Sequence, residues 1–308
     1  MECFSLLAPR NCPEWVIAEL GMFSYSLVSV PLYRKLEVAI THIIAECELS
    51  VIIVQDEETA RFLLQFVPPS SSLRHIVTIR DVRRTEVIRT ASELGVKIVR
   101  FSDLEKCGAG RNLEAAPPEP GHLAVICYSP MMSSDLRPKG AMLSHQNLIA
   151  AASACLLQLG GKTDCRSVRA MISPADEAPR TSDLMVSYLP MCYALERCCQ
   201  LALVLAGGRV GFYCGNMRGL ATDLRDLRPT IVPTVPRVVN RIYDQSTRLA
   251  RKNLLVRWFL NRCLTNIMQR QFAGQKSQSL WSRLVLRHFR RQFGKLCGRE
   301  WGAVDVGL

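Results

Sequence analysis

The sequence lacks any pair of cysteines spaced as C-x-x-C, although it contains thirteen cysteines. Only Cys198 and Cys199 are adjacent, and the others are scattered along the chain. Structural zinc sites and the disulfide frameworks of small secreted domains both need regularly spaced cysteines, so the spacing argues against both. We therefore expect reduced thiols in a cytosolic environment.

Long hydrophobic runs are also missing. The longest apolar-looking stretch, Trp15 to Tyr33, is interrupted by Glu19 and Pro31, so we expect no transmembrane span. The opening residues include Glu2 and no basic region, which argues against a secretory signal peptide. With 308 residues, 48% of them hydrophobic, the chain is long enough for one large globular domain or two ordinary ones.

Acidic residues are scarce towards the end of the chain. Between Arg237 and Glu300 there are fifteen basic residues but only two acidic ones. A solvated helical face is the simplest interpretation of this basic block, and contact with an anionic membrane surface is the next. Nucleic acid is the least favoured partner, because aromatic residues do not alternate with the basic ones as a base-stacking platform requires.

What the sequence does contain is an alternation of β-rich runs and helical patterns, which predicts an α/β fold with a largely parallel sheet. Before the proline-rich break at 117–120, the pattern predicts strands at 4–7, 51–54 and 75–79 and helices at 13–24, 37–47 and 57–66. After the break it predicts strands at 123–128, 184–189, 210–213 and 230–232. We expect a first α/β lobe at 1–116, a second at 117–235 and a basic helical segment at 236–308.

Local signals refine this outline. Asn11 is placed to cap the first helix, with Pro13 and Glu14 in its first turn. The stretch 160–181 is polar and contains two prolines, so we expect an exposed loop. The basic segment is predicted to form long helices at 237–250, 254–272 and 280–292.

One segment, residues 128–145, has the pattern of a loop that surrounds nucleotide phosphates after a strand. Such loops use glycine and hydroxyl residues so that backbone N–H groups approach the phosphates. Here Ser129-Pro-Met-Met-Ser-Ser-Asp-Leu-Arg137 contains no glycine. The candidate phosphate-binding residues are the hydroxyls, the lysine and the glycine of this segment: Ser129, Ser133, Ser134, Lys139 and Gly140. Gly140 is also expected to permit a close turn into a helix that begins near His145.

The chain resembles the long-chain acyl-CoA synthetases of the adenylate-forming superfamily over nearly its whole length. The resemblance rests on blocks that occur in the family's order: Asn11-Cys-Pro-Glu-Trp15, Val30-Pro-Leu-Tyr33, Pro138-Lys-Gly-Ala-Met-Leu-Ser-His145, Val186-Ser-Tyr-Leu-Pro190, Glu196-Arg197, Gly207-Gly-Arg-Val-Gly-Phe212, Pro229-Thr-Ile-Val-Pro-Thr-Val-Pro-Arg237 and Asn240-Arg-Ile-Tyr-Asp244. It implies the two α/β lobes of the large N-terminal domain of an adenylate-forming enzyme.

The resemblance also implies an activity. The family joins a long-chain fatty acid to CoA through an acyl-AMP intermediate, with ATP, Mg²⁺ and CoA as cofactors or cosubstrates. It places such enzymes on the cytoplasmic side of the endoplasmic reticulum or on the mitochondrial outer membrane. Tyr193, where the family has a histidine, and Glu196 are further candidate nucleotide-binding residues by this resemblance.

Besides Tyr193, the chain departs from the family at two further places. The family's loop reads Thr-Ser-Gly-Thr-Thr-Gly, whereas here Pro130 removes an N–H and Asp135 adds a negative charge. Non-glycine residues forced to positive φ would be strained by roughly 1–3 kcal/mol each. After Gly298 the adenine-binding motif, the hinge and the small C-terminal domain with its lysine do not follow.

We therefore expect a truncated, divergent family member that is a fatty acid CoA ligase by descent and inactive as this chain, with no catalytic residue or metal ligand assigned. Two alternatives stay open. One is a non-catalytic pseudoenzyme that binds a fatty acyl chain, an anionic membrane or an intact relative as a heterodimer. The other is a truncated gene product.

Overall fold

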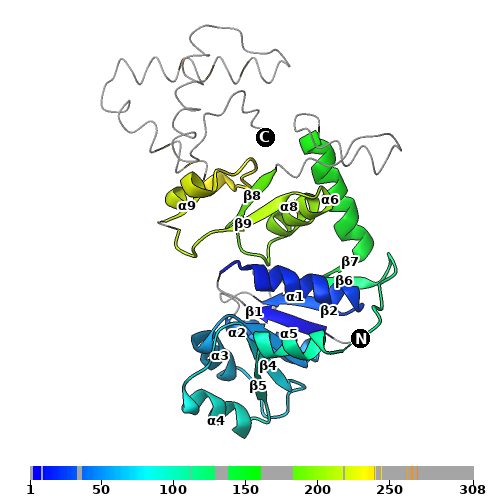
Figure 1. The fold of residues 1–308 in the computed structure, drawn as a ribbon, viewed down its shortest axis with the longest axis vertical. Helices are drawn as coiled ribbons and strands as arrows, with labels where there is room; N and C mark the ends of the chain where they lie inside the picture. Colours follow the sequence, from blue (N-terminus) through cyan, green and yellow to red (C-terminus); the bar gives the residue numbers. More distant parts are fainter. Residues whose placement is uncertain are drawn as a thin grey trace. The chain divides into compact units, whose positions relative to one another are not determined.

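The computed structural model describes residues 3–7, 10–32, 37–111, 113–128, 138–160, 183–217 and 219–238, together with 240, 244, 262, 265 and 269. Figure 1 shows its helices and strands, which the contacts within the chain divide into two compact units. Unit 1 comprises Met1–Pro179 and Tyr188–Gly207, and unit 2 comprises Arg180–Ser187 and Gly208–Leu308. Each unit is therefore built from two separate stretches of the chain.

Unit 1 contains a seven-stranded sheet with strand order β5-β4-β3-β1-β2-β6-β7. Its strands are β1 (Cys3–Leu7), β2 (Val28–Leu32), β3 (Val51–Val54), β4 (His75–Thr78), β5 (Lys97–Arg100), β6 (Leu123–Tyr128) and β7 (Gly140–Ser144). Its helices are α1 (Pro13–Ser24), α2 (Glu37–Glu46), α3 (Glu57–Leu64), α4 (Thr85–Glu93), α5 (Phe101–Ala109), α6 (His145–Gly160) and α8 (Ala194–Leu205). All neighbouring strands pair in parallel except β6 and β7, which are antiparallel, so the predicted α/β fold is confirmed.

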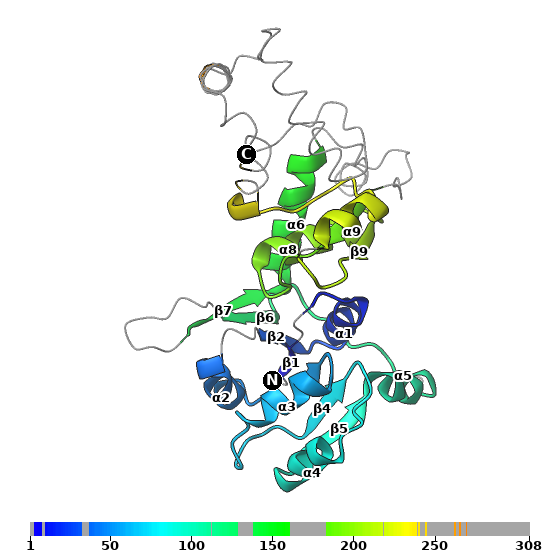
Figure 2. The same cartoon turned by 90° about the vertical axis from the view of Figure 1, so that its left-hand side faces the viewer.

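Successive side chains along each strand of this sheet point to opposite faces, and both faces are buried. Leu7, Ile52 and Ile76 face a core built with helices α2, α3 and α4, which supply Ala39, Ile40, Ile43, Ile44, Ala60, Leu63, Leu64, Val87 and Ala91. The adjacent residues Leu6, Ile53 and Val77 face the opposite side, where they pack with residues of α1 and α5, namely Trp15, Met22 and Phe101. Figure 2 shows α1 and α2 on opposite sides of the sheet.

The lobe boundary predicted at residue 117 does not divide this sheet. Strand β6, which follows the proline-rich break, pairs with β2 through Ser29 and Val125. The segment before β6 is tied to the end of α1, because the Ala116 N–H donates to the Ser24 carbonyl at 3.1 Å and Ser26 Oγ donates to the Ala116 carbonyl at 2.7 Å. The break is thus a connection that returns the chain to the same sheet.

The expected role of Asn11 as the helix cap is wrong. Cys12 occupies the N-cap position of α1 and makes no side-chain capping hydrogen bond. Pro13 and Glu14 do lie in the first turn, as predicted. The Asn11 side chain is buried and its Nδ2 donates to the carbonyl oxygen of Leu189 at 2.6 Å. Asn11 therefore joins the start of the chain to the second stretch of unit 1.

Unit 2 contains the parallel pair β8 (Leu184–Ser187) and β9 (Arg209–Phe212), followed by helix α9 (Leu220–Leu227). A Cβ on Gly211 would lie 2.5 Å from Leu227 Cδ1, so glycine allows α9 to pack closely on β9. The strand predicted at 230–232 is present as an isolated bridge between Met185 and Ile231. The predicted loop at 160–181 and the long basic helices fall almost entirely outside the described residues.

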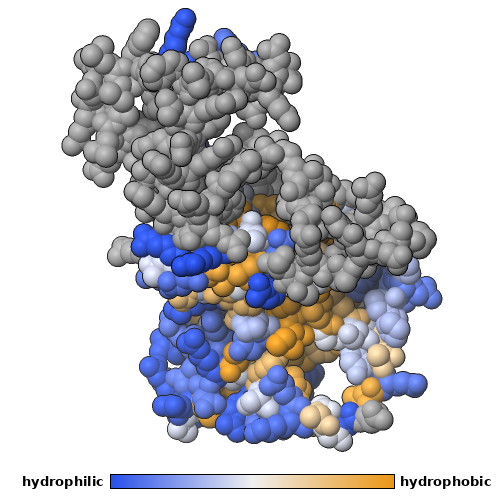
Figure 3. Space-filling view, turned by 45° about the horizontal axis from the view of Figure 1, so that its top comes forward, coloured by the Kyte–Doolittle hydropathy of each residue, from blue (hydrophilic) through white to orange (hydrophobic). Residues whose placement is uncertain are grey.

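Figure 3 shows hydrophobic patches among hydrophilic side chains on the described surface. Within unit 1, helix α1 exposes Ile17 and Leu20 by 55% and 37%, and β7 exposes Met142 by 72%. None of the helices in the described part of the chain is long and apolar enough to cross a membrane.

Candidate functional site

The β6–β7 hairpin holds the predicted phosphate loop at its ends. Tyr128, the last residue of β6, pairs with Gly140, the first residue of β7. Ser129, Ser133 and Ser134 lie between these strands, outside the described residues. Lys139 is exposed directly before β7, so its ammonium group is accessible at the end of the loop segment.

The direct turn predicted at Gly140 is absent, whereas its phosphate-binding role stays a prediction. A five-residue strand, β7, separates it from α6, so it does not turn directly into the helix, although α6 begins at His145 as expected. A Cβ at this position would lie 2.8 Å from Ile126 Cγ2 and 3.1 Å from the Tyr128 ring. Gly140 is therefore required by the close approach of β7 to the side chains of β6.

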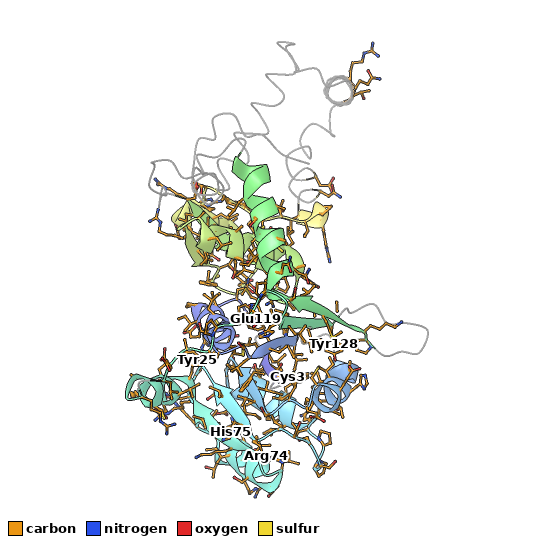
Figure 4. All side chains as sticks on the ribbon, turned by 90° about the vertical axis from the view of Figure 1, so that its right-hand side faces the viewer. Cys3, Tyr25, Arg74, His75, Glu119 and Tyr128 are labelled. Atoms are coloured by element: carbon orange, nitrogen blue, oxygen red, sulfur yellow. The ribbon has the colours of Figure 1, made fainter. Side chains whose placement is uncertain are left out.

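Tyr128 anchors the hairpin to helix α2 (Figure 4). Its hydroxyl donates to Glu46 Oε2 at 2.5 Å, and Cys47 Sγ lies 3.2 Å from the same oxygen. Burial raises the pKa of Tyr128 above its ordinary value, and the contacts with Cys47 and Glu46 act in the same direction. Tyr128 therefore stays protonated and holds one end of the loop segment in a fixed place.

The second predicted group, Tyr193 and Glu196, lies at the start of helix α8. Tyr193 is the N-cap residue, is 39% exposed, and its carbonyl accepts from the Arg197 N–H at 3.3 Å. Glu196 is fully buried, and its Oε1 accepts from Gln200 Nε2 at 3.0 Å. Contact between Glu196 and a nucleotide would thus require α8 to move, and the binding role of both residues stays a prediction.

A buried ion pair between Glu19 of α1 and Arg197 of α8 is the strongest polar contact that the sequence reading missed. The Arg197 guanidinium donates through Nη1 to Glu19 Oε1, and through Nη2 to the Met191 carbonyl at 3.3 Å. Ser29 Oγ donates to the same Glu19 oxygen at 2.6 Å. Both charged residues are at most 6% exposed.

The electrostatics of Arg197 favour its charged form. Burial acts to lower the pKa of the guanidinium, but the Glu19 carboxylate together with Cys127 and Cys192 outweighs it, so the pKa lies above its ordinary value. The signal for this pair was present in the sequence, since Glu19 interrupts an apolar stretch four residues after the buried Trp15. A charge on the buried stripe of a helix needs a partner.

A family model described as AMP-binding enzyme matches residues 5–293. The chain belongs to this family. It is 32% identical to rat (Rattus norvegicus) long-chain-fatty-acid–CoA ligase 5 over 289 residues, which are 92% of this chain and 40% of that protein. It is also 32% identical to human (Homo sapiens) long-chain-fatty-acid–CoA ligase 1 over 92% of this chain and 39% of that protein. The chain thus spans about two fifths of the length of these relatives.

Solved structures of adenylate-forming enzymes share the fold of this AMP-binding family member. The A domain of a carboxylic acid reductase from Segniliparus rugosus, in complex with AMP and a co-purified carboxylic acid, gives a TM-score of 0.60 at 18% identity, over 96% of this chain and 43% of that one. The adenylation domain of the Mycobacterium chelonae carboxylate reductase gives 0.61 at 17% identity, over 96% and 41%. At this identity the likeness establishes the fold alone.

Few of the described residues are suited to bind the ATP or Mg²⁺ that the family uses. Lys139 supplies an exposed positive charge beside the loop segment, as a phosphate group requires. Gly140 is used for packing against β6 and offers no special backbone freedom. Among the residues that the structure describes, no three His, Cys, Asp or Glu side chains gather where a metal ion could bind.

Proposed function

We propose that this chain descends from long-chain fatty acid CoA ligases and that, as this chain, it does not form an acyl adenylate. The supporting observation is the loop that β6 and β7 frame: its residues 129–137 contain no glycine and carry Pro130, Met131, Met132 and Asp135. The family uses ATP, Mg²⁺ and CoA, and we propose that this chain does not retain them.

The chain keeps the framework of strands and buried contacts around the loop, while the loop sequence itself is altered. The sheet, the buried Glu19–Arg197 pair and the Tyr128 anchor keep the strands around the loop in place. The loop has lost the small residues that let backbone N–H groups surround a triphosphate. Losing a single preorganised group of this kind typically slows a reaction by about 10²–10³-fold, and here several are lost together.

Pyrophosphate exchange tests the proposal directly. The purified chain is incubated with palmitate, Mg·ATP and labelled pyrophosphate, and the rat ligase named above serves as the positive control. We expect no fatty-acid-dependent exchange with this chain. Exchange at a rate within tenfold of the control would refute the proposal.

A nucleotide-binding measurement tests whether the altered loop is the reason that the chain forms no acyl adenylate. We expect the native chain to show no saturable binding of Mg·ATP in equilibrium dialysis at millimolar concentration. A chain carrying Pro130→Gly, Met131→Gly and Asp135→Gly should gain binding, and adding Lys139→Met should abolish that gain. If the native chain binds ATP as well as the glycine variant does, the loop is not the defect.

A non-catalytic binding protein is the second candidate, because the chain keeps the framework while its loop departs from the family. Its ligand would be a long-chain fatty acyl group, an intact relative, or an anionic membrane contacted by the basic segment. Displaceable binding of a fluorescent fatty acid supports the first of these. Co-purification with the rat ligase supports the second, and sedimentation with phosphatidylserine vesicles supports the third. Failure of all three assays removes this candidate.

A further inference from the structure

Helices α6 and α8 pack against each other in unit 1 around a small apolar cluster. Its buried members are Ala152 and Leu156 of α6, Ala202 of α8 and Ala206, the residue that caps the end of α8, with Cys155 packed against them. Three of the four buried residues are alanines, which add little bulk between the two helices. Side chains next to them on the facing surfaces can therefore come into direct contact.

Two cysteines are next to these alanines. Cys155 follows Ala152 by three residues, and Cys199 precedes Ala202 by three and Ala206 by seven. Positions spaced by three, four and seven residues share one face of a helix, so each thiol lies on the face that meets the other helix. Cys198 lies on the neighbouring stripe of α8, with Leu201 and Leu205, and makes a natural comparison.

The packed faces of α6 and α8 bring the two thiols together, and each affects the ionisation of the other. The interaction with Cys199 lowers the pKa of the Cys155 thiol to about 7, although burial opposes the shift. The interaction with Cys155, together with burial, raises the pKa of Cys199. At pH 7 about half of the Cys155 thiol is therefore ionised, with the protonated Cys199 thiol beside it. Cys198 differs, because burial raises the pKa of its thiol.

Neither cysteine of the pair is fully buried. Cys155 and Cys199 are half-buried free thiols rather than fully enclosed ones. The thiolate is the reactive form of cysteine, and a redox-sensitive cysteine typically has a second thiol beside it that resolves the first oxidation product. The pair meets both conditions, and nothing in the ligase reaction requires it.

We propose that Cys155 and Cys199 form a peroxide-sensitive dithiol that closes to a disulfide between α6 and α8. The oxidant is hydrogen peroxide. The Cys155 thiolate attacks one peroxide oxygen, the O–O bond breaks, and the hydroxide released takes up a proton to leave water and a Cys155 sulfenic acid. The Cys199 sulfur then attacks the sulfenic sulfur, the S–O bond breaks, and a second water leaves with the Cys199 proton. In total, two thiols and one peroxide give one disulfide and two waters.

The disulfide can be identified in the full-length chain by mass spectrometry. The reduced chain is treated with a small excess of hydrogen peroxide at pH 7, the remaining thiols are alkylated, and tryptic peptides are compared with and without dithiothreitol. We expect a cross-link between the peptide that contains Cys155 and the peptide that begins at Cys198, and its loss on reduction. Oxidation of Cys155 to a sulfinic acid without a cross-link would overturn the proposal.

Single variants identify the partner, because Cys198 and Cys199 fall on the same tryptic peptide. The cross-link should disappear in Cys155→Ala and Cys199→Ala and persist in the matched control Cys198→Ala. A cross-link that persists in Cys199→Ala and disappears in Cys198→Ala would assign the wrong cysteine to the pair and refute the proposal as stated.

A pH profile separates this site from a merely structural contact. The rate of iodoacetamide alkylation of Cys155 should be half-maximal near pH 7 in the native chain. In Cys199→Ala the midpoint should move up by about one to two pH units, towards that of an ordinary thiol. A fully folded Cys199→Ala chain with an unchanged midpoint would show that Cys199 does not activate Cys155.

Discussion

Replacing Arg197 with methionine removes one half of the buried ion pair. Methionine fills a similar volume, so the change removes a charge more than it creates a cavity. The Glu19 carboxylate, 6% exposed, would keep only the Ser29 hydroxyl as a hydrogen-bond donor among its present partners. Removing one partner of a buried pair costs about 3–5 kcal/mol, so we expect the free energy of unfolding to fall by that amount.

A double-mutant cycle separates the pair from general damage to the core. Glu19→Leu alone should also cost about 3–5 kcal/mol, because it leaves the Arg197 charge with the Met191 carbonyl as the acceptor that remains of its described partners. The double variant removes both charges, so it should cost less than the sum of the single variants by at least about 2 kcal/mol.

Urea unfolding followed by far-UV circular dichroism measures these differences. The matched control is the exposed pair of Arg89 and Glu93, whose side chains are 72% and 65% exposed and whose removal by Arg89→Met should leave the midpoint unchanged. Additive single effects, or an Arg197→Met cost below about 1 kcal/mol, would refute the expectation that the two buried charges depend on each other.

Three further predictions concern other contacts. Gly140→Ala should destabilise the chain by about 1–3 kcal/mol, because its Cβ would meet the stiff methyl group of Ile126. In the control Gly108→Ala the new Cβ has open space in α5, so this variant should stabilise the chain by about 0.5–1 kcal/mol. Thermal or urea unfolding measures both changes. The raised pKa of Tyr128 means that this group ionises in the unfolded chain before it ionises in the folded one, so the free energy of unfolding falls as the pH rises above 10, by about 1.4 kcal/mol per pH unit. In Tyr128→Phe this contribution to the slope should be absent, which urea unfolding at several pH values measures. Asn11→Asp keeps an oxygen that could cap α1 but removes the donor to the Leu189 carbonyl, so we expect the free energy of unfolding to fall by about 1–3 kcal/mol. An unchanged free energy of unfolding would instead favour a capping role for Asn11.

The parts of the fold that sequence reasoning found are those with strong local patterns. The strands Val51–Val54 and Leu123–Tyr128 and the helix Pro13–Ser24 have the predicted bounds, because apolar runs and an N-terminal proline are local signals. Strand β2 was missed, since Pro31 lies within it and proline argues against a central strand. Strand β7 was missed as well, because Gly140 was interpreted as a turn residue when only the nearby β6 side chains explain it.

The candidate site could be predicted only in part, for a similar reason. The sequence proposes a phosphate loop with Lys139 beside it, because such a loop has a local pattern of residue types, and this assignment stays a prediction. The Glu19–Arg197 pair and the Cys155–Cys199 contact join helices that are far apart along the chain, so no local pattern identifies the partner. The same limit explains why Asn11 was given a local capping role.

The order in which the chain is synthesised sets a constraint on how unit 1 can form. Arg197 follows Glu19 by 178 residues, so the buried carboxylate of α1 has no arginine until the second stretch of unit 1 has been translated. At roughly 5–20 residues per second, the ribosome needs about 10–35 s for that interval. During this time the nascent α1 carries a carboxylate on its core-facing side without the partner that neutralises it. Docking of residues 188–207 is therefore the step that gives this carboxylate its arginine partner.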